Sequence, residues 1–189
     1  MKHKGKAPMK WRLRKTVVLV GMMGAGKTAV GTQLARMLQV PFRDSDDEIV
    51  KAANMSIAEI FTRDGEAFFR QKESQVIARL LADAPSILST GGGAYMAQSN
   101  RDEIKAGGVA VWLRADVDLL WNRVRHRNNR PLLRTANPYE TLRTLYAERE
   151  PVYARAELIV DSEHGLSIDA TAQRVVEALS TRADVLERI

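Results

Sequence analysis

The chain has 189 residues, of which 45% are apolar and 28% are charged. That length is typical of one domain with a substantial core, and the composition is that of a globular protein, not a fibre, a disordered chain or a membrane protein. The chain has no cysteine, which excludes disulfides, thiolate metal sites and a cysteine nucleophile and is compatible with a reducing compartment.

The net charge of +6 comes from the start of the chain. Of the 29 Lys and Arg residues, seven lie within residues 1–15, which leaves 22 against 23 Asp and Glu in the rest, a net charge of −1. We therefore expect a flexible basic tail at 1–15, a single domain at 16–182 and a short C-terminal end at 183–189. A basic tail can contact phosphates or anionic lipid. Because the remainder is close to neutral, we expect no nucleic-acid partner.

The apolar run 17–20 follows the basic residues and could belong to a signal peptide. A signal peptide needs an apolar run of about 7–15 residues and a cleavage site. Cleavage here would destroy the Gly-Lys-Thr element at 26–28. No other run approaches the ~20 apolar residues of a membrane span. We expect a cytoplasmic protein with no membrane partner.

Short apolar runs alternate with longer segments of helical period along the chain. Five runs are predicted to be buried strands: 16–20, 40–44, 86–89, 109–113 and 158–160. Helices are predicted after the glycine loop at 21–26 and from Ser56, Glu66, Asp116, Asn137 and Ser167. The helix from Asn137 is predicted to end before Pro151, because proline disrupts helix interiors. This alternation indicates an α/β fold with a parallel sheet covered by helices on both faces.

The segment from Gly21 to Thr28 reads Gly-Met-Met-Gly-Ala-Gly-Lys-Thr and fits the phosphate-binding pattern G-x-x-x-x-G-K-[ST]. It lies between a predicted strand and a predicted helix, where backbone N–H groups and the helix N-terminus can bind phosphate oxygens. Lys27 can reach the β- and γ-phosphates of ATP, and the Thr28 hydroxyl can coordinate Mg²⁺. A guanine-reading N-K-x-D motif and the usual acidic end of a Walker-B strand are absent. This disfavours a GTPase and requires another carboxylate near the metal.

Two further motifs follow predicted strands, at the edge where such sheets bind ligands. In an extended Asp44-Ser45-Asp46 segment, both carboxylates would face one site, one toward the Mg²⁺ water shell and one toward an acceptor hydroxyl. Alternatively, Ser45 or Asp46 only caps the next helix. The triplet Gly91-Gly92-Gly93 either lets a ligand approach bare backbone or is a flexible turn.

Three arginines are candidates for anion binding: Arg70, Arg130 and Arg149. A guanidinium can bind carboxylate or phosphate through two parallel hydrogen bonds, although an arginine taken singly is more often a solvated surface residue. Arg130 lies in a polar segment, 126–134, which is either an ordinary loop or a mobile lid.

Together these motifs resemble the shikimate kinase family over nearly the whole chain, from about Thr16 to the last helix. The matching stretches are 21–28, 44–46, Gly-Glu-x-x-Phe-Arg at 65–70, 91–93, Arg-Pro-Leu-Leu at 130–133, and Arg149 ahead of Pro-Val-Tyr at 151–153. The resemblance implies a three-layer P-loop kinase with a five-stranded parallel sheet of order 2-3-1-4-5. It also implies a substrate-binding segment at about 44–73 and a mobile lid at about 126–137. The implied reaction moves the γ-phosphoryl group of ATP to the 3-hydroxyl of shikimate, in aromatic amino-acid biosynthesis.

The resemblance implies roles for individual residues. For ATP these are Gly24, Ala25, Gly26, Lys27, Thr28, Ala29, Arg123 and Arg130, with Arg123 packing on adenine. For shikimate they are Asp46, Arg70, Gly92, Gly93 and Arg149, with the two arginines on its carboxylate and Asp46 on its ring hydroxyls. Mg²⁺ would be held by Thr28 and Asp44, the latter through water. Catalysis would rest on Lys27, Asp46 and Arg130, so that Arg130→Ala lowers turnover more than shikimate binding. The segment 162–165 matches the family's adenine loop poorly.

Two alternatives remain. Another small-molecule P-loop kinase, such as a gluconate kinase, would share the phosphate loop but would not need the Arg70 and Arg149 pair with the glycine triplet. A nucleotide-dependent binding protein or switch would hydrolyse ATP slowly without an acceptor and would bind nucleic acid with a steep salt dependence. For the kinase we expect a monomer.

Overall fold

The central feature of the computed structural model, which describes residues 9–127 and 131–189, is a five-stranded parallel sheet. The strand order is β3-β4-β2-β5-β6. Numbered within this sheet, the order is 2-3-1-4-5, so the prediction is confirmed. The bounds are β2 Thr16–Val20, β3 Phe42–Asp44, β4 Ile87–Ser89, β5 Gly108–Arg114 and β6 Leu158–Asp161.

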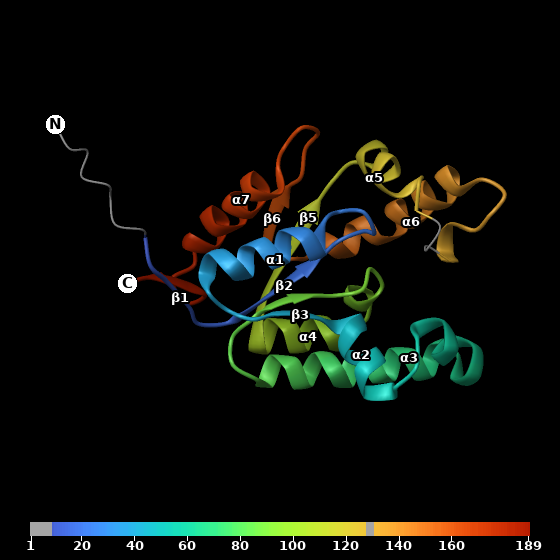
Figure 1. The fold of residues 1–189 in the computed structure, drawn as a ribbon, viewed down its shortest axis with the longest axis horizontal. Coiled ribbons are helices and arrows are strands. Elements are labelled where there is room, and N and C mark those ends of the chain that lie inside the picture. Colours follow the sequence, from blue (N-terminus) through green and yellow to red (C-terminus); the bar gives the residue numbers. More distant parts are fainter. Residues whose placement is uncertain (1–8, 128–130) are drawn as a thin grey trace.

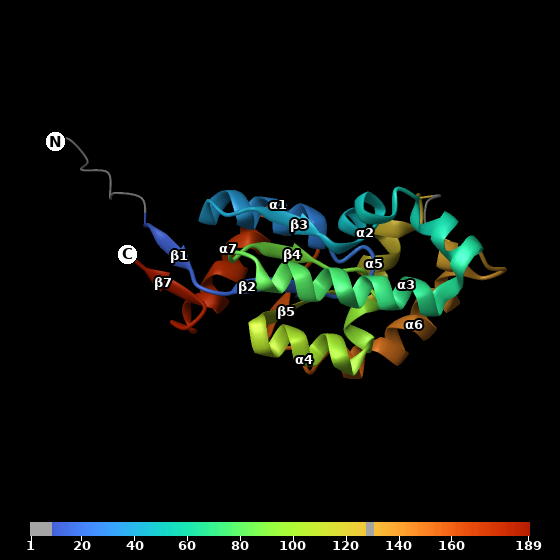
Figure 2. The ribbon, with the colours of Figure 1, turned by 90° about the horizontal axis from the view of Figure 1, so that it is seen from below.

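Helices cover both faces of the sheet. The helices are α1 Lys27–Leu38, α2 Ser45–Ala53, α3 Ile57–Ala82, α4 Gln98–Gly107, α5 Val117–Val124, α6 Pro138–Tyr153 and α7 Ile168–Ser180, with short 3-10 turns η1 Ala94–Met96 and η2 Pro131–Leu133. α1 packs against α7 on one face, and α3 against α4 on the other (Figures 1 and 2). This explains why the central strand β2 is buried at every position and shows no polar alternation. Within the described ranges, no helix is long and apolar enough to cross a membrane.

The predicted helix starts are observed, and their caps have the expected geometry. Ser56 opens α3 with a capping box, in which Glu59 N donates to Ser56 Oγ at 3.1 Å and Ser56 N donates to Glu59 Oε2 at 3.3 Å. The side chains of Asp116, Asn137 and Ser167 cap α5, α6 and α7, each by accepting a hydrogen bond from one backbone N–H group of the first turn. The two helices predicted from Ser56 and Glu66 meet at Gly65, whose φ of 84° interrupts α3.

Three local expectations are wrong. α6 does not end before Pro151 but continues to Tyr153, because tertiary contacts override the weak helix propensity at its last turn. Residues 45–53 form helix α2, so Asp46 lies in a helical turn and not in an extended segment. Helix α4 was not predicted, since it has little apolar content beyond the buried Ile104.

The expected N-terminal tail contains a strand. β1 (Trp11–Leu13) pairs antiparallel with β7 (Leu186–Arg188) in a two-stranded sheet (Figure 2). Lys15 Nζ donates to Asp184 Oδ2 at 3.0 Å, so basic residues of the expected tail meet acidic residues near the other end of the chain. The prediction of a flexible tail to residue 15 is therefore wrong for residues 11–15.

Candidate functional site

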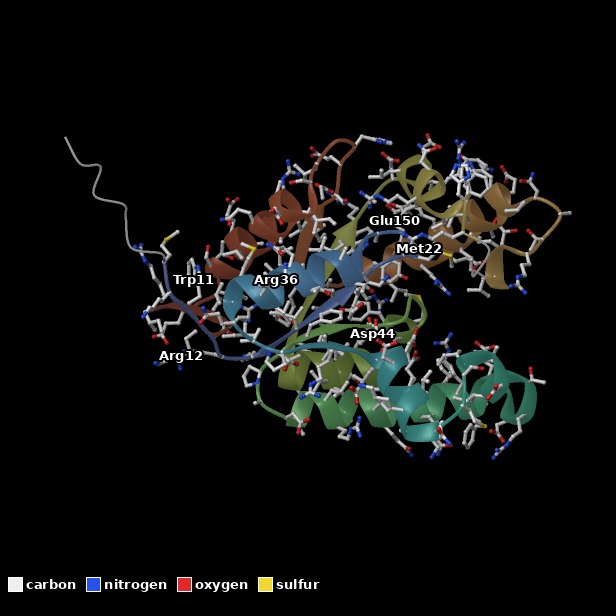
Figure 3. The ribbon with its side chains drawn as sticks, viewed as in Figure 1. Trp11, Arg12, Met22, Arg36, Asp44 and Glu150 are labelled. Atoms are coloured by element: carbon white, nitrogen blue, oxygen red, sulfur yellow. The ribbon has the colours of Figure 1, made fainter. Side chains whose placement is uncertain are left out.

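A cavity of about 630 Å³ lies at the carboxyl edge of the sheet, where the phosphate loop meets the ends of β3 and β4. Its lining comes from four parts of the chain: residues 23–30, Asp44 with Asp46, residues 89–92, and a group that includes Arg123, Arg127, Ser162 and Leu166. In Figure 3, Met22 and Asp44 lie at the middle of the molecule, far from Trp11 and the two-stranded sheet. The parallel strands thus bring together segments that are distant in sequence.

The phosphate loop has the backbone conformation that its glycines permit. Gly24 and Gly26 have φ angles of 82° and 90°, and Gly26 is the N-cap of α1. Lys27 Nζ donates to the carbonyl oxygens of Gly21 at 2.7 Å and Met22 at 3.0 Å, which holds the ammonium over the loop. The N-terminus of α1 and the lysine therefore face the same cavity, an arrangement suited to binding phosphate groups.

Arg123 joins the phosphate loop to the segment after β6. Its Nη1 donates to the Gly24 carbonyl at 3.0 Å and its Nη2 to Ser162 Oγ at 3.1 Å. Burial lowers the pKa of the Arg123 guanidinium. Ser162 had no predicted role, yet it directly follows β6, and its position at the carboxyl edge of a strand was the available signal.

The carboxylates of Asp44 and Asp46 line the cavity from the start of α2. Asp44 Oδ1 accepts from the backbone N–H groups of Asp46 at 2.9 Å and Asp47 at 3.2 Å, so Asp44 is the helix cap. The alternative that Ser45 or Asp46 caps this helix is therefore wrong. Burial raises the pKa of Asp44; burial and then the neighbouring charge of Asp44 raise that of Asp46.

The glycine triplet lies where the predicted substrate residues converge. A Cβ atom on each glycine would approach a different charged group: 3.1 Å from Asp46 Oδ1 for Gly91, 2.9 Å from Arg149 Nη1 for Gly92, and 2.5 Å from Arg70 Nη2 for Gly93. Side chains from α2, α6 and α3 therefore surround one short turn. Because glycine has no side chain, the triplet leaves room for these carboxylate and guanidinium groups of the protein itself. The sequence pattern did not indicate this role.

Glu73 is a site residue that sequence reasoning missed. Its side chain is 1% exposed, and its Oε1 accepts from Arg70 Nη1 at 2.9 Å. In the described part of the chain, Glu73 Oε2 and Asp46 Oδ1 are buried without a hydrogen-bond partner. Burial raises the pKa of Glu73, against the opposing effect of Arg70. The available signal was the spacing of three residues from Arg70, which puts the two side chains on one helix face.

Tyr153 is a second residue beside the glycine triplet to which the sequence analysis assigned no role. Its side chain is fully buried, and its hydroxyl donates to the Gly92 carbonyl at 2.5 Å. Because the helix was expected to end before Pro151, Tyr153 was not placed on the same helix as Arg149.

The structure describes the two residues expected to hold Mg²⁺ but not the arginine expected in the lid. Thr28 and Asp44 both line the cavity. Within residues 9–127 and 131–189, no group of three or more His, Cys, Asp or Glu side chains could hold a metal ion. Arg130 lies outside the described residues.

Comparison with known proteins identifies close relatives. A protein-family model described as shikimate kinase matches residues 23–180. The chain is 66% identical to a shikimate kinase of Cereibacter sphaeroides, over 93% of this chain and 88% of that protein. It is 64% identical to a shikimate kinase of Ruegeria pomeroyi, over 93% of this chain and 90% of that protein.

Solved structures of the same family also match this chain. The shikimate kinase of Acinetobacter baumannii in complex with shikimate matches with a TM-score of 0.83 and 38% identity, over 89% of this chain and 94% of that chain. A gluconokinase of Sinorhizobium meliloti matches with a TM-score of 0.60 and 20% identity, over 92% of this chain and 95% of that chain. The second similarity is one of fold alone.

Proposed function

The chain belongs to the shikimate kinase family and is an ATP-dependent P-loop kinase, and from this premise we propose how its own residues act on shikimate. The reaction transfers the γ-phosphoryl group of ATP to the 3-hydroxyl of shikimate, a step toward chorismate and the aromatic amino acids. The observation that carries the residue assignment is the convergence of Arg70, Arg149 and Asp46 on the glycine triplet, beside the phosphate loop. Two cations and an acidic group at one place suit an acceptor that has both a carboxylate and hydroxyl groups.

Arg70 and Arg149 bind the acceptor carboxylate. Their guanidinium nitrogens approach adjacent glycines, with Nη2 of Arg70 at Gly93 and Nη1 of Arg149 at Gly92. Guanidinium groups bind carboxylates through charge-assisted hydrogen bonds, which are about twice as strong as neutral ones. The two arginines therefore determine which end of the acceptor faces away from the phosphate loop.

Asp46 binds the ring hydroxyls and orients the one that reacts. Its Oδ1 and Glu73 Oε2 are buried acceptors that no described residue satisfies. Buried acceptors without donors are costly, and hydroxyl groups of a bound acceptor would relieve that cost. Asp46 lines the cavity beside the phosphate loop, so the hydroxyl it holds can face the γ-phosphate.

During transfer, the acceptor oxygen forms a bond to the γ-phosphorus while the bond to the β–γ bridging oxygen breaks, and ADP leaves. The hydroxyl proton passes to Asp46 or to water. Catalysis of phosphoryl transfer consists mainly of positioning and charge stabilisation. Lys27 supplies positive charge at the β- and γ-phosphates, and the α1 N-terminus with Gly24–Ala29 holds the phosphate chain. Arg123 holds the nucleotide side through its contacts with Gly24 and Ser162. Mg²⁺, held by Thr28 and through water by Asp44, would neutralise phosphate charge.

The phosphate loop and the proposed acceptor-binding side chains come from one chain, so the proposed reaction does not require a second copy, and we propose a monomer. Because the phosphoryl donor is ATP, we propose that the enzyme works in the cytoplasm. The other candidate acceptors are gluconate, which also has a carboxylate and hydroxyls, and a nucleoside monophosphate.

The test is ADP release from Mg-ATP with shikimate, gluconate, a nucleoside monophosphate or no acceptor, with the phosphorylated product identified by NMR. Rapid release with shikimate alone and phosphate on its 3-hydroxyl is expected. Faster ADP release with gluconate than with shikimate would identify gluconate as the acceptor. Equal slow release in all four reactions would contradict an acceptor site at the glycine triplet.

A further inference from the structure

We propose that Tyr153 is a positioning residue for the acceptor carboxylate, because its hydroxyl holds the Gly92 backbone at the point that the Arg149 guanidinium approaches. This inference rests on the proposed function, in which Arg149 binds that carboxylate. Tyr153 itself does not line the cavity, so it would act through its neighbours.

The geometry of α6 brings Tyr153 and Arg149 together. The helix continues through Pro151, and residues four apart on a helix lie on the same face. Arg149 Nη1 and the Tyr153 hydroxyl lie 2.9 Å and 3.7 Å from the position that a Cβ atom would take on Gly92. Two consecutive turns of one helix therefore contact the same point of the glycine triplet.

The hydroxyl and the guanidinium meet at Gly92. The hydroxyl donates to the Gly92 carbonyl at 2.5 Å, and Arg149 Nη1 approaches the same glycine. The hydrogen bond from Tyr153 therefore fixes the backbone of the substrate site at the point beside which the guanidinium lies.

The phenol ring is held rigidly. Its exposed fraction is 0%, and it stacks on Trp112 of β5 with ring centroids 5.9 Å apart. The hydroxyl lies 4.0 Å from the sulfur of Met22 in the phosphate loop. Burial raises the pKa of the Tyr153 phenol, so it remains a donor at neutral pH. The residue thus joins β5, α6 and the glycine turn next to the phosphate loop.

The test is Tyr153→Phe, which keeps the ring and its packing and removes only the hydroxyl. We expect the KM for shikimate to rise about 10-fold, because the Gly92 carbonyl loses its hydrogen-bond donor, with the KM for ATP within about twofold. Arg149→Lys should raise the same KM, and the double variant should be less impaired than the product of the two single effects, because both act through one guanidinium.

The matched control is Tyr139→Phe on the same helix. Its hydroxyl donates to Asp118 Oδ1 at 3.0 Å, so this variant also loses a phenolic hydrogen bond, but at the opposite end of α6 from Tyr153. We expect its shikimate KM to be that of the wild type. Melting temperatures of both variants show whether a kinetic change only follows lost stability.

The outcomes separate the two proposals. An unchanged shikimate KM in Tyr153→Phe, or effects that multiply fully with Arg149→Lys, would overturn the role of Tyr153 and leave the proposed function intact. Equal increases in the KM values of shikimate and ATP would also overturn it, since they indicate a general structural role. A wild-type enzyme without activity on shikimate would overturn both proposals.

Discussion

Arg70 and Glu73 form a hydrogen-bonded ion pair in which the carboxylate is enclosed and the guanidinium reaches the glycine triplet. Nη1 and Oε1 are 2.9 Å apart, and the side chains are 35% and 1% exposed, respectively. Removing one member of such a buried pair leaves the other charge without compensation. Glu73 therefore determines the orientation of Arg70.

Replacing Glu73 by Gln tests this relationship. The amide keeps the size and one acceptor, but its hydrogen bond to Arg70 is weaker by about 1 kcal/mol than one to a carboxylate. We expect the KM for shikimate to rise about fivefold, with little change for ATP. Glu66→Gln is the control, because Glu66 faces Arg70 Nε at 3.6 Å but is 69% exposed and should contribute little. Equal increases in the shikimate KM of the two variants would show that the burial of Glu73 does not strengthen its effect on Arg70.

Gly93→Ala should displace Arg70 without unfolding the protein. The φ of Gly93 is −88°, which alanine adopts readily, but its Cβ would lie 2.5 Å from Arg70 Nη2. The flexible arginine would move, so we expect a rise of roughly 10-fold in the shikimate KM and a change in stability below about 1 kcal/mol. Steady-state kinetics and thermal unfolding check this. Gly107→Ala, at the end of α4, is the control with normal kinetics, and a normal KM in Gly93→Ala would refute the crowding argument.

Asp46→Asn should lose activity but gain stability at neutral pH. Burial, followed by the charge of Asp44, raises the folded-state pKa of Asp46 above its ordinary 3.8. The folded state then binds more protons than the unfolded state, so Asp46 lowers the wild-type stability as pH rises from 3.8 through the folded-state pKa. The uncharged amide avoids this loss. We expect a melting temperature higher by about 1–3 °C near neutral pH, with the difference vanishing in acid.

Turnover of Asp46→Asn should fall by about 100-fold, the usual contribution of a residue that handles the reacting proton. Melting curves across the pH range and initial rates check the two effects together. Asp47→Asn, at an exposed neighbour outside the cavity lining, should change neither. A lower melting temperature for Asp46→Asn at neutral pH would show that the charged Asp46 carboxylate stabilises the fold, contrary to this prediction.

Leu13→Ala tests the structural role of β1. Leu13 is 8% exposed and pairs with Leu186 of β7. Loss of a buried leucine side chain typically costs about 2–5 kcal/mol, and at the lower end we expect a fall in melting temperature of about 4–8 °C. Kinetic constants at room temperature should not change, since β1 is distant from the cavity (Figure 3). Arg12→Ala on the exposed side of the strand is the control. Equal melting temperatures for Leu13→Ala and the wild type would indicate that β1 does not contribute to stability.

Much of the fold could be predicted because its signals are local. The strand at Thr16–Val20, the glycine loop and the caps at Ser56 and Ser167 each depend on residues within a few positions. Continuous apolar strands required a sheet covered on both faces. The elements that were missed lack such signals: β1 has only three residues, and its partner β7 lies at the other end of the chain.

The candidate site could be predicted as a set of residue types but not as an arrangement. By itself, the sequence determined the phosphate loop, the α/β fold and, through several motifs in order, the family. The tertiary structure alone decided that Glu73 supports Arg70, that Tyr153 contacts Gly92, and that each glycine of the triplet makes room for a charged side chain. The physical reason is that motifs record local backbone geometry, whereas burial and hydrogen bonding depend on which distant segments the folded chain brings into contact.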